Sequence, residues 1–306
     1  MEDMQGCKRG GHRIKSYARA HFVHPGYIHT VRLRGLTSGA RYWYRYGSPA
    51  LADGWSAVHS FAAPARERRP FSFVAFGDLG TATWPDMRRF PEYWDCPAAQ
   101  ATADRLAAQL QEDRAPPFDF VLHLGDISYA VGFAPRWEQF HHLVAPVASH
   151  VPYLVVDGNH DVGDDSFGEC GVPFFARFHF PNHPQPYYSY DHSYLHVVAV
   201  STEEDPVWEP STESYKWLEQ DLAAVNRTAT PWVVIAGHRT MYTSDVHWTR
   251  VKESWKMQAA LEPLMKKYGV SLYMGGHVHN YERTCFVRHK QCVDDGVVAV
   301  QIGTAG

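Results

Sequence analysis

No stretch of this sequence is apolar for long enough to cross a bilayer as a helix. The first residues, Met1 to Arg9, contain no apolar segment of the kind found in signal peptides, so the chain as written carries no export signal. Basic residues are not in excess either, because 29 Lys and Arg stand against 33 Asp and Glu. Lys and Arg are also scattered rather than clustered, so neither nucleic acid nor a membrane surface is an expected partner.

Cysteine is scarce, and an odd total of five leaves at least one residue unpaired. Cys285 and Cys292 are close enough in the sequence to close a small disulfide loop. The triplet Asn226-Arg227-Thr228 is an acceptor sequence for N-linked glycosylation, with Asn226 as the modified residue. Both features favour a history in the secretory pathway.

Apolar residues, by contrast, are plentiful. A hydrophobic fraction of 45% over 306 residues is enough for one large domain and a smaller one, and nineteen histidines are compatible with metal binding. A charged stretch bounded by prolines and without periodicity, residues 65–70, is typical of a linker. We therefore divide the chain into an N-terminal domain at 1–64 and a catalytic domain at 71–306.

The N-terminal domain has the pattern of β-structure. Residues 27–33 and 41–46 alternate as strands do, with a turn at Thr37-Ser38-Gly39 between them. Tyr42, six residues after Leu36, resembles the tyrosine corner of a fibronectin type III sandwich, although an ordinary aromatic hairpin explains it equally well. Only about half of such a sandwich is visible, so we expect a partial domain.

Beyond the linker, apolar strands alternate with helices, as in an α/β domain. The helices are expected at 98–111, 213–225 and 252–267, where apolar residues recur at helical spacing. The strands are expected at 71–76, 118–124, 153–156, 194–200, 232–236 and 270–274.

Five short segments each end an apolar run with a residue that can bind a metal ion. Each follows a predicted strand, so their loops converge at one edge of the sheet structure. A glycine beside each candidate ligand permits a sharp turn and a close backbone approach. The segments are Gly77-Asp78-Leu79-Gly80, Gly125-Asp126-Ile127-Ser128-Tyr129, Gly158-Asn159-His160-Asp161, Gly237-His238 and Gly276-His277-Val278-His279.

Each segment taken alone also has a purely structural explanation. A Gly-Asp pair after a strand is commonly a turn, and a Gly-His pair can begin a helix or pack in a core. The complete series in this order is far less expected by chance. The Gly-Asn-His-Asp and Gly-His-x-His segments are the most specific, because paired imidazoles can address neighbouring metals and an Asn carbonyl is an uncommon ligand.

In their order and spacing, the five segments resemble the metallophosphoesterase superfamily and, within it, the purple acid phosphatases. The resemblance spans Phe71 to Gly306, and the preceding β segment resembles that family's N-terminal fibronectin-like domain. It implies an α/β fold in which two β-sheets are flanked by helices in four layers (α/β/β/α). Both ends are shorter than the family pattern, so we expect a truncated form with an incomplete C-terminus.

The resemblance also implies a dinuclear metal centre bridged by Asp126. Hard Fe(III) suits a phenolate and a carboxylate, whereas an amide and two imidazoles suit Zn(II), Fe(II) or Mn(II). Within this resemblance, Tyr129 identifies the purple branch. Other relatives have an Asp-x-His first motif, whereas this chain has Gly80 in place of that histidine and a tyrosine, Tyr129, in the second motif. The ferric ligands would be Asp78, Tyr129 and His279, and the divalent ligands would be Asn159, His238 and His277.

The implied activity is that of an acid phosphatase, which hydrolyses phosphate monoesters by in-line attack of a metal-bound hydroxide. His160 would stabilise the transition state and protonate the departing alkoxide. His247, nine residues after His238, is a second candidate, although a solvated loop histidine explains it nearly as well. Asp161 either orients His160 through a hydrogen bond or caps a turn.

Two other functions remain open. The same site could act on phosphodiesters or nucleotides, because the loops at 201–214 and 240–248 would shape the substrate pocket. A shortened chain could instead be inactive and bind only a metal or a partner. The family resemblance implies a secreted or lysosomal location and small phosphate esters as partners, and the sequence predicts no oligomeric state.

Overall fold

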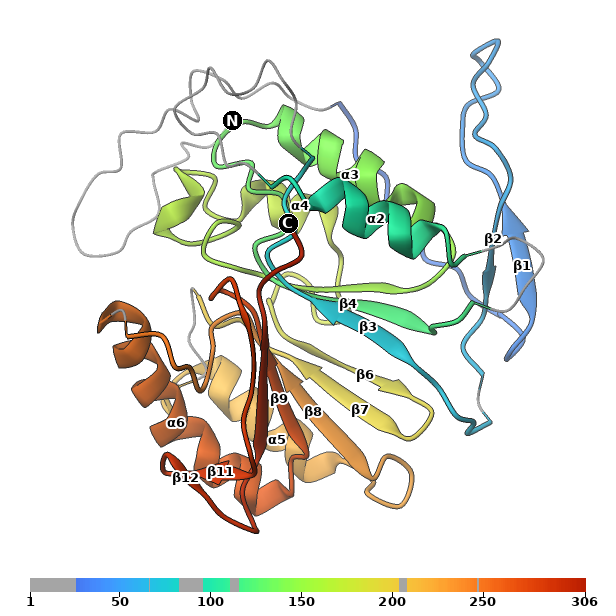
Figure 1. The fold of residues 1–306 in the computed structure, drawn as a ribbon. Coiled ribbons are helices and arrows are strands. Elements are labelled where there is room, and N and C mark those ends of the chain that lie inside the picture. The colour runs from blue at the N-terminus through green and yellow to red at the C-terminus, as the bar shows by residue number, and fades with distance from the viewer. Residues whose placement is uncertain (1–25, 66, 83–95, 111–115, 204–207, 247) are drawn as a thin grey trace.

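Two β-sheets form the centre of the molecule in a computed structural model, which describes residues 26–65, 67–82, 96–110, 116–203, 208–246 and 248–306 (Figure 1). The smaller sheet has three parallel strands in the order β3-β4-β5. These strands are β3 (Phe73–Phe76), β4 (Phe120–Leu124) and β5 (Tyr153–Val156).

The larger sheet has six strands in the order β10-β13-β9-β8-β7-β6. Its four central strands are parallel, and the edge strands β6 and β10 pair antiparallel with their neighbours. The bounds are β6 (Tyr188–His192), β7 (Leu195–Ala199), β8 (Trp232–Ala236), β9 (Leu272–Gly275), β10 (Tyr281–Arg283) and β13 (Val298–Ile302).

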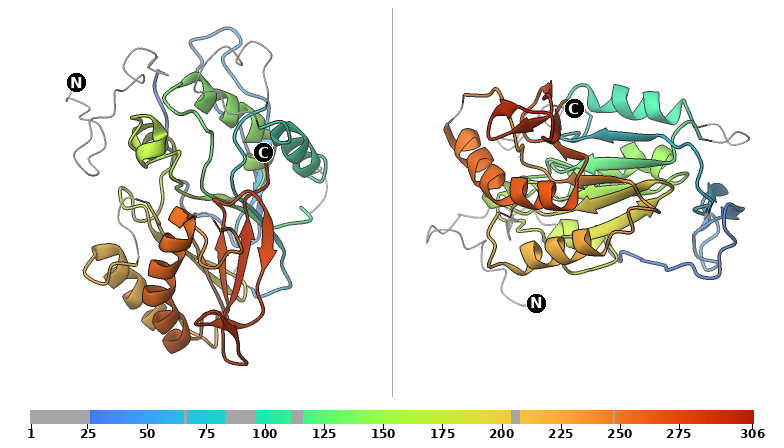
Figure 2. Two further views of the ribbon diagram at one scale, coloured as in Figure 1. Left: turned by 60° about the vertical axis from the view of Figure 1, so that its left-hand side comes forward. Right: turned by 90° about the horizontal axis from the view of Figure 1, so that it is seen from below.

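Helices cover the outer faces of both sheets (Figures 1 and 2). The smaller sheet is covered by α2 (Ala99–Ala107) and α3 (Pro135–Ala148), with α4 (Val172–Arg177) beside them. The larger sheet is covered by α5 (Glu213–Ala224) and α6 (Trp248–Tyr268). No helix in the described ranges is both long enough and apolar enough to span a membrane.

Side-chain alternation along the strands produces two separate cores. In β7, Val197 belongs to the cluster that includes both sheets, whereas Val198 belongs to the cluster under α5 and α6. Val234 and Ile235 of β8 alternate in the same way, because successive residues of a strand point to opposite faces. The four layers confirm the predicted α/β/β/α arrangement.

The predicted element bounds are close to those observed. The strands at 153–156 and 232–236 match β5 and β8, and the other strands predicted beyond the linker differ from the observed ones by one or two residues at an end. The helix predicted at 252–267 begins earlier, at Trp248, and the helix predicted at 98–111 ends earlier, at Ala107, with position 111 outside the described residues. Strands β6, β10 and β13 and helix α3 were not predicted, although the apolar run of β13 could have indicated that strand.

The described part of the N-terminal segment is an antiparallel pair, β1 (Arg41–Tyr44) and β2 (His59–Ala62). The hydroxyl oxygen of Tyr42 accepts a hydrogen bond from the backbone nitrogen of Thr37 at 2.7 Å, the contact expected of a tyrosine corner. The strand predicted at 27–33 is wrong, because these residues form no strand. No strand among the described residues pairs with them, and an extended segment needs such a neighbour for its backbone hydrogen bonds.

A short hairpin follows β10. It consists of β11 (Val287–Arg288) and β12 (Gln291–Cys292), which pair antiparallel. The disulfide between Cys285 and Cys292 closes it, as their spacing indicated.

Candidate metal centre

The loops after β3, β4, β5, β8 and β9 meet at one edge of the two sheets (Figure 1). Backbone hydrogen bonds join them: the nitrogen of Asp78 donates to the carbonyl oxygen of Gly125 at 3.0 Å, and that of Gly276 donates to His238 at 2.7 Å. The nitrogen of Gly77 also donates to Ile302 at 2.7 Å, which ties the smaller sheet to the end of β13. All five predicted ligand segments therefore lie in one place.

Three predicted ligands form one group around Asp78. The Tyr129 hydroxyl lies 3.1 Å from Oδ1 of Asp78 and 3.0 Å from Nε2 of His279. The same His279 nitrogen is 3.2 Å from Oδ1 of Asp78. Tyr129 is fully buried and the His279 side chain is 53% exposed, so this group reaches from the interior to the surface.

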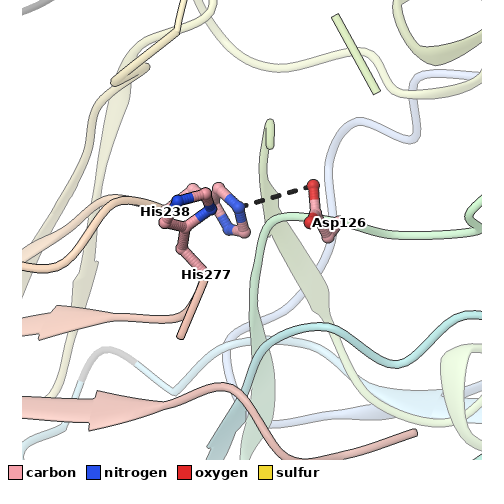
Figure 3. Close-up of side chains that lie close together, drawn as sticks. All are labelled: Asp126, His238 and His277. Atoms are coloured by element: carbon pink, nitrogen blue, oxygen red, sulfur yellow. Dashed lines mark ion pairs between the residues drawn. The ribbon is translucent and has the colours of Figure 1, made fainter. Parts of the chain in front are cut away.

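A second group lies around the side-chain oxygen of Asn159. Nε2 of His238 is 3.0 Å from this oxygen, and Nδ1 of His277 is 2.9 Å from it. Asp126 adjoins the group, with its Oδ1 atom 3.4 Å from Nε2 of His238 (Figure 3). The ligand atoms of Asp126, His238 and His277 all lie within 4.8 Å of one another.

The donor and acceptor pattern of this second group fits a bound cation. Nδ1 of His238 lies 2.7 Å from the carbonyl oxygen of Leu124, which can only accept, so Nδ1 carries a proton. In a neutral His238 ring, Nε2 would then point a lone pair at the oxygens of Asn159 and Asp126. Three acceptors facing one another need a positive charge between them, either a proton or a metal ion.

Charges within the site lower the pKa of its buried carboxyl group and raise the pKa values of its imidazole and phenol groups. Burial by itself would raise the pKa of Asp126, but the neighbouring His238 holds it well below its usual range. Burial would lower the pKa of His238, but the Asp126 carboxylate raises it to about 10. Burial, together with Asp126 and Asp78, raises the pKa of Tyr129, so its phenolate needs a nearby cation. Metal binding would therefore displace protons.

Four of the seven predicted ligands have a backbone conformation that is rare outside glycine. The φ angles are +61° at Asp78, +52° at Asp126, +47° at Tyr129 and +69° at His277. Such left-handed residues cost about 1–3 kcal/mol each and concentrate at functional sites. The strands therefore end in turns that place these side chains at the cost of local strain.

Glycines let the backbone pack directly against the ligands. A Cβ atom at Gly158 would lie 2.3 Å from Oδ1 of Asp126, and one at Gly276 would lie 2.5 Å from Oδ2 of Asp78. A Cβ atom at Gly125 would lie 2.5 Å from Nδ1 of His238. The glycines predicted from the sequence thus provide space that no other residue leaves.

The remaining candidate residues are placed differently. The backbone nitrogen of His160 donates to Oδ1 of Asp126 at 3.0 Å, and its ring Nε2 lies 3.9 Å from Oδ2. Both carboxylate oxygens of Asp161 accept hydrogen bonds from the backbone nitrogen of Ile127, and one also accepts from Gly158. Asp161 thus caps the turn, and this explains its burial better than an orienting contact with the His160 ring. His247 lies outside the described residues.

Asn226, the predicted glycosylation site, is exposed in the turn after α5. Its side-chain oxygen accepts hydrogen bonds from the backbone nitrogens of Thr228 and Ala229. The turn thus presents the acceptor triplet at the surface.

The guanidinium of Arg239, a residue that was not predicted from the sequence, adjoins the second group. Its Nη1 atom lies 3.5 Å from Nε2 of His277. Glu203 holds Nε at 3.0 Å and Nη2 at 2.8 Å, and Glu253 of α6 pairs with Nη1. The position of Arg239 directly after the predicted ligand His238 was a signal that could have indicated it. The two glutamates restrict the side chain of Arg239 to this orientation.

Two family models match the chain. The calcineurin-like phosphoesterase model matches residues 71–281, and the purple acid phosphatase N-terminal domain model matches residues 8–63. The first of these covers most of the chain and all seven predicted ligands.

Curated relatives and a solved structure agree with these matches. The chain is 34% identical over 312 residues to "Probable inactive purple acid phosphatase 27" of Arabidopsis thaliana, covering 92% of this chain and 49% of that protein. It is 32% identical over 268 residues to a nucleotide pyrophosphatase/phosphodiesterase of Hordeum vulgare, covering 81% and 70% respectively. The structure of a purple acid phosphatase from yellow lupin seeds matches with a TM-score of 0.77 at 31% identity, covering 90% and 52%.

The chain spans about half the length of the first Arabidopsis relatives that it matches. The match to the calcineurin-like phosphoesterase model nevertheless includes the five loops and the two groups of predicted ligands described above. The chain therefore belongs to the purple acid phosphatases, within the calcineurin-like phosphoesterase family.

Proposed function

We propose that this protein is an acid phosphatase that hydrolyses phosphate monoesters at a dinuclear Fe(III)–M(II) centre. The observation that carries the proposal is the meeting of all seven predicted ligands in two adjacent groups, with distances between neighbouring ligand atoms of 2.9–3.4 Å. Asp78, Tyr129 and His279 would hold Fe(III). Asn159, His238 and His277 would hold Zn(II), Fe(II) or Mn(II), and Asp126 would contact both metals.

When bound, the two metals would supply the attacking hydroxide and neutralise charge on the phosphoryl oxygens. His160 is the side chain that we propose as the proton donor. Its ring lies beside the Tyr129 ring, with 4.9 Å between the two centroids, at the edge of the site. We assign it the protonation of the leaving alkoxide, and His247 remains a proposed second group of this kind.

A second candidate function is hydrolysis of phosphodiesters or nucleotides at the same site. The Hordeum vulgare relative, a nucleotide pyrophosphatase/phosphodiesterase, favours this alternative, because this chain covers 70% of its length. Substrate choice depends on the walls of the pocket rather than on the metal ligands, so both activities are compatible with the same seven residues.

A third possibility is a protein that binds metal without turnover. Several Arabidopsis relatives are named probable inactive purple acid phosphatases. The complete ligand set in this chain supports activity instead, because none of the seven predicted metal ligands is replaced by another residue.

Metal analysis with a visible spectrum, followed by phosphate release from p-nitrophenyl phosphate and bis(p-nitrophenyl) phosphate at pH 5 and pH 7, tests these alternatives. The proposal expects two metals per chain, a tyrosinate-to-iron band and faster release from the monoester at pH 5. Faster release from the diester would favour the second function. Two metals without release from either ester would favour the third.

The biological setting is also a proposal. Small phosphate esters are the expected partners, with no role for nucleic acid or a membrane surface. The exposed Asn226 triplet and the Cys285–Cys292 disulfide support a secreted or lysosomal location with a glycan on Asn226. The division into 1–64, 65–70 and 71–306 remains our proposed domain organisation.

A further inference from the structure

A short 3₁₀ helix beside the metal centre, η2 (Asp164–Ser166), touches two residues of the site through one of its members. The Asp165 carboxylate accepts a hydrogen bond from the side-chain nitrogen of Asn159 at 2.9 Å. The main-chain oxygen of the same residue lies 3.1 Å from the ring Nδ1 of His160. Asp165 thus contacts a proposed metal ligand and the proposed proton donor through different groups.

The carboxylate contact determines how the Asn159 amide is oriented. An ionised carboxylate can only accept, so the NH₂ end of the amide must face Asp165. The carbonyl end then faces the ring nitrogens of His238 and His277, at 3.0 Å and 2.9 Å. An amide turned the other way would offer an N–H group to the cation and an oxygen to the carboxylate, and both contacts would be unfavourable.

The carbonyl contact determines the proton position on His160 in the same manner. A carbonyl oxygen only accepts, so Nδ1 of the ring carries the proton. The other nitrogen, Nε2, is then the one that faces the carboxylate of Asp126, at 3.9 Å. Proton transfer is thereby directed to Nε2, on the side of the metal centre.

Hydrogen bonds of the neighbouring Ser166 hold the turn that carries Asp165 in place. The buried Ser166 hydroxyl donates to the carbonyl oxygen of Gly163 at 2.6 Å and accepts from the backbone nitrogen of Cys170 at 3.1 Å. The backbone nitrogen of Gly163 in turn donates to the carbonyl oxygen of Asn159 at 3.1 Å. The turn and the ligand loop are therefore one hydrogen-bonded unit.

We propose that Asp165 is a positioning residue that orients both Asn159 and His160. Its side chain keeps the Asn159 carbonyl directed at the divalent site, and its main chain keeps Nε2 of His160 available for proton transfer. The His160 part rests on the proposed function, whereas the Asn159 part requires only that the site binds a divalent metal.

Calorimetric titration of the metal-free protein with Zn(II) tests the Asn159 part without any need for turnover. Asp165→Ala should weaken Zn(II) binding by about 10–100-fold, the usual effect of losing a group that orients a ligand. Asp165→Asn should recover most of this loss, because its side-chain carbonyl can still accept from Asn159. Glu213→Ala removes an exposed acid that pairs with Lys216, and it should bind Zn(II) as the parent chain does. Unchanged binding in Asp165→Ala would refute the proposal.

Nitrogen NMR of the His160 ring tests the second part, again without turnover. In Asp165→Ala the main-chain oxygen is retained, so the ring should keep its proton on Nδ1. Ser166→Ala, which loosens the turn, should increase the population with the proton on Nε2. A ring protonated at Nε2 in the parent protein would overturn this assignment. Absence of phosphatase activity alone would contradict the proposed function and leave both measurements interpretable.

Discussion

The Nε2 atom of His238 lies 3.0 Å from the side-chain oxygen of Asn159, although the proton of a neutral His238 ring is held on the opposite nitrogen by Leu124. Two acceptor atoms at this distance repel each other unless a cation separates them. In the metal-free protein the cation is a proton, consistent with a pKa of His238 raised to about 10 by Asp126. The site is thus built for a positive charge that a metal would provide.

Tyr129→Phe should remove the visible absorption band of the iron-loaded protein and weaken iron binding. The Tyr129 hydroxyl is 3.1 Å from Asp78 and 3.0 Å from His279, so its loss removes a ligand between two others. Visible spectra of protein loaded with Fe(III) and Zn(II) measure the effect. Tyr242→Phe is the matched control, because the Tyr242 hydroxyl is buried and has no hydrogen-bond partner among the described residues. A band that persists in Tyr129→Phe would contradict the assignment.

Asp126→Asn should lower turnover at least about 100-fold and reduce the number of bound metals, because one carboxylate serves both groups. The same change should lower the pKa of His238 from about 10 in the metal-free protein, since Asp126 is the charge that raises it. Metal analysis, initial rates and an NMR titration of His238 measure these effects. Asp295→Asn, a change in an exposed acid that pairs with Lys266, should alter none of them. Wild-type activity in Asp126→Asn would rule out the bridging role.

Gly158→Ala should both destabilise the protein and weaken metal binding. A Cβ atom there would lie 2.3 Å from Oδ1 of Asp126, so the carboxylate must move, and overpacking of this kind costs about 1–3 kcal/mol. Gly269→Ala separates the two effects. Its φ of +63° makes alanine unfavourable, but the nearest atom to the new Cβ is an Arg227 side-chain nitrogen at 3.6 Å. Gly269→Ala should lower the free energy of unfolding without changing Zn(II) affinity. Equal Zn(II) affinities in Gly158→Ala and Gly269→Ala would contradict the proposed clash with Asp126.

Glu169 should make the folded protein less stable as pH rises. Burial raises the pKa of Glu169 to about 7, and the hydrogen bonds from Trp137 and Gly132 offset this only in part. The folded state therefore binds more protons than the unfolded state between the ordinary glutamate pKa and pH 7. Stability from this group is fully present below that range and is lost as pH rises through it, by up to about 3 kcal/mol.

Glu169→Gln removes this titration and keeps a side-chain oxygen that can accept from Trp137. Urea unfolding at pH 4.5 and pH 8 should give similar free energies for the two proteins at the lower pH, with the variant more stable at the higher pH. A variant whose free energy of unfolding falls with pH as steeply as that of the parent would show that Glu169 is not the titrating group.

Much of the fold was predictable because its signals are local. The apolar run at 232–236 became β8 unchanged, and a run that is apolar throughout predicts two buried faces. The segment at 27–33 alternates as a strand does but forms no strand. The difference is a pairing partner, which belongs to the rest of the chain and cannot be recognised within seven residues.

The candidate site, like the fold, was predictable from the sequence only in part. The sequence by itself determined which seven residues could bind metals, in which order, and that glycines beside them would leave space. Only the tertiary structure decided that Asp161 caps a turn, that Arg239 lies beside His277, and that the Asp165 carboxylate accepts a hydrogen bond from Asn159. The residue type of each candidate ligand can be read from a single short segment of the sequence. The contacts that orient these side chains are hydrogen bonds between different loops, and they form only when the two sheets have packed together.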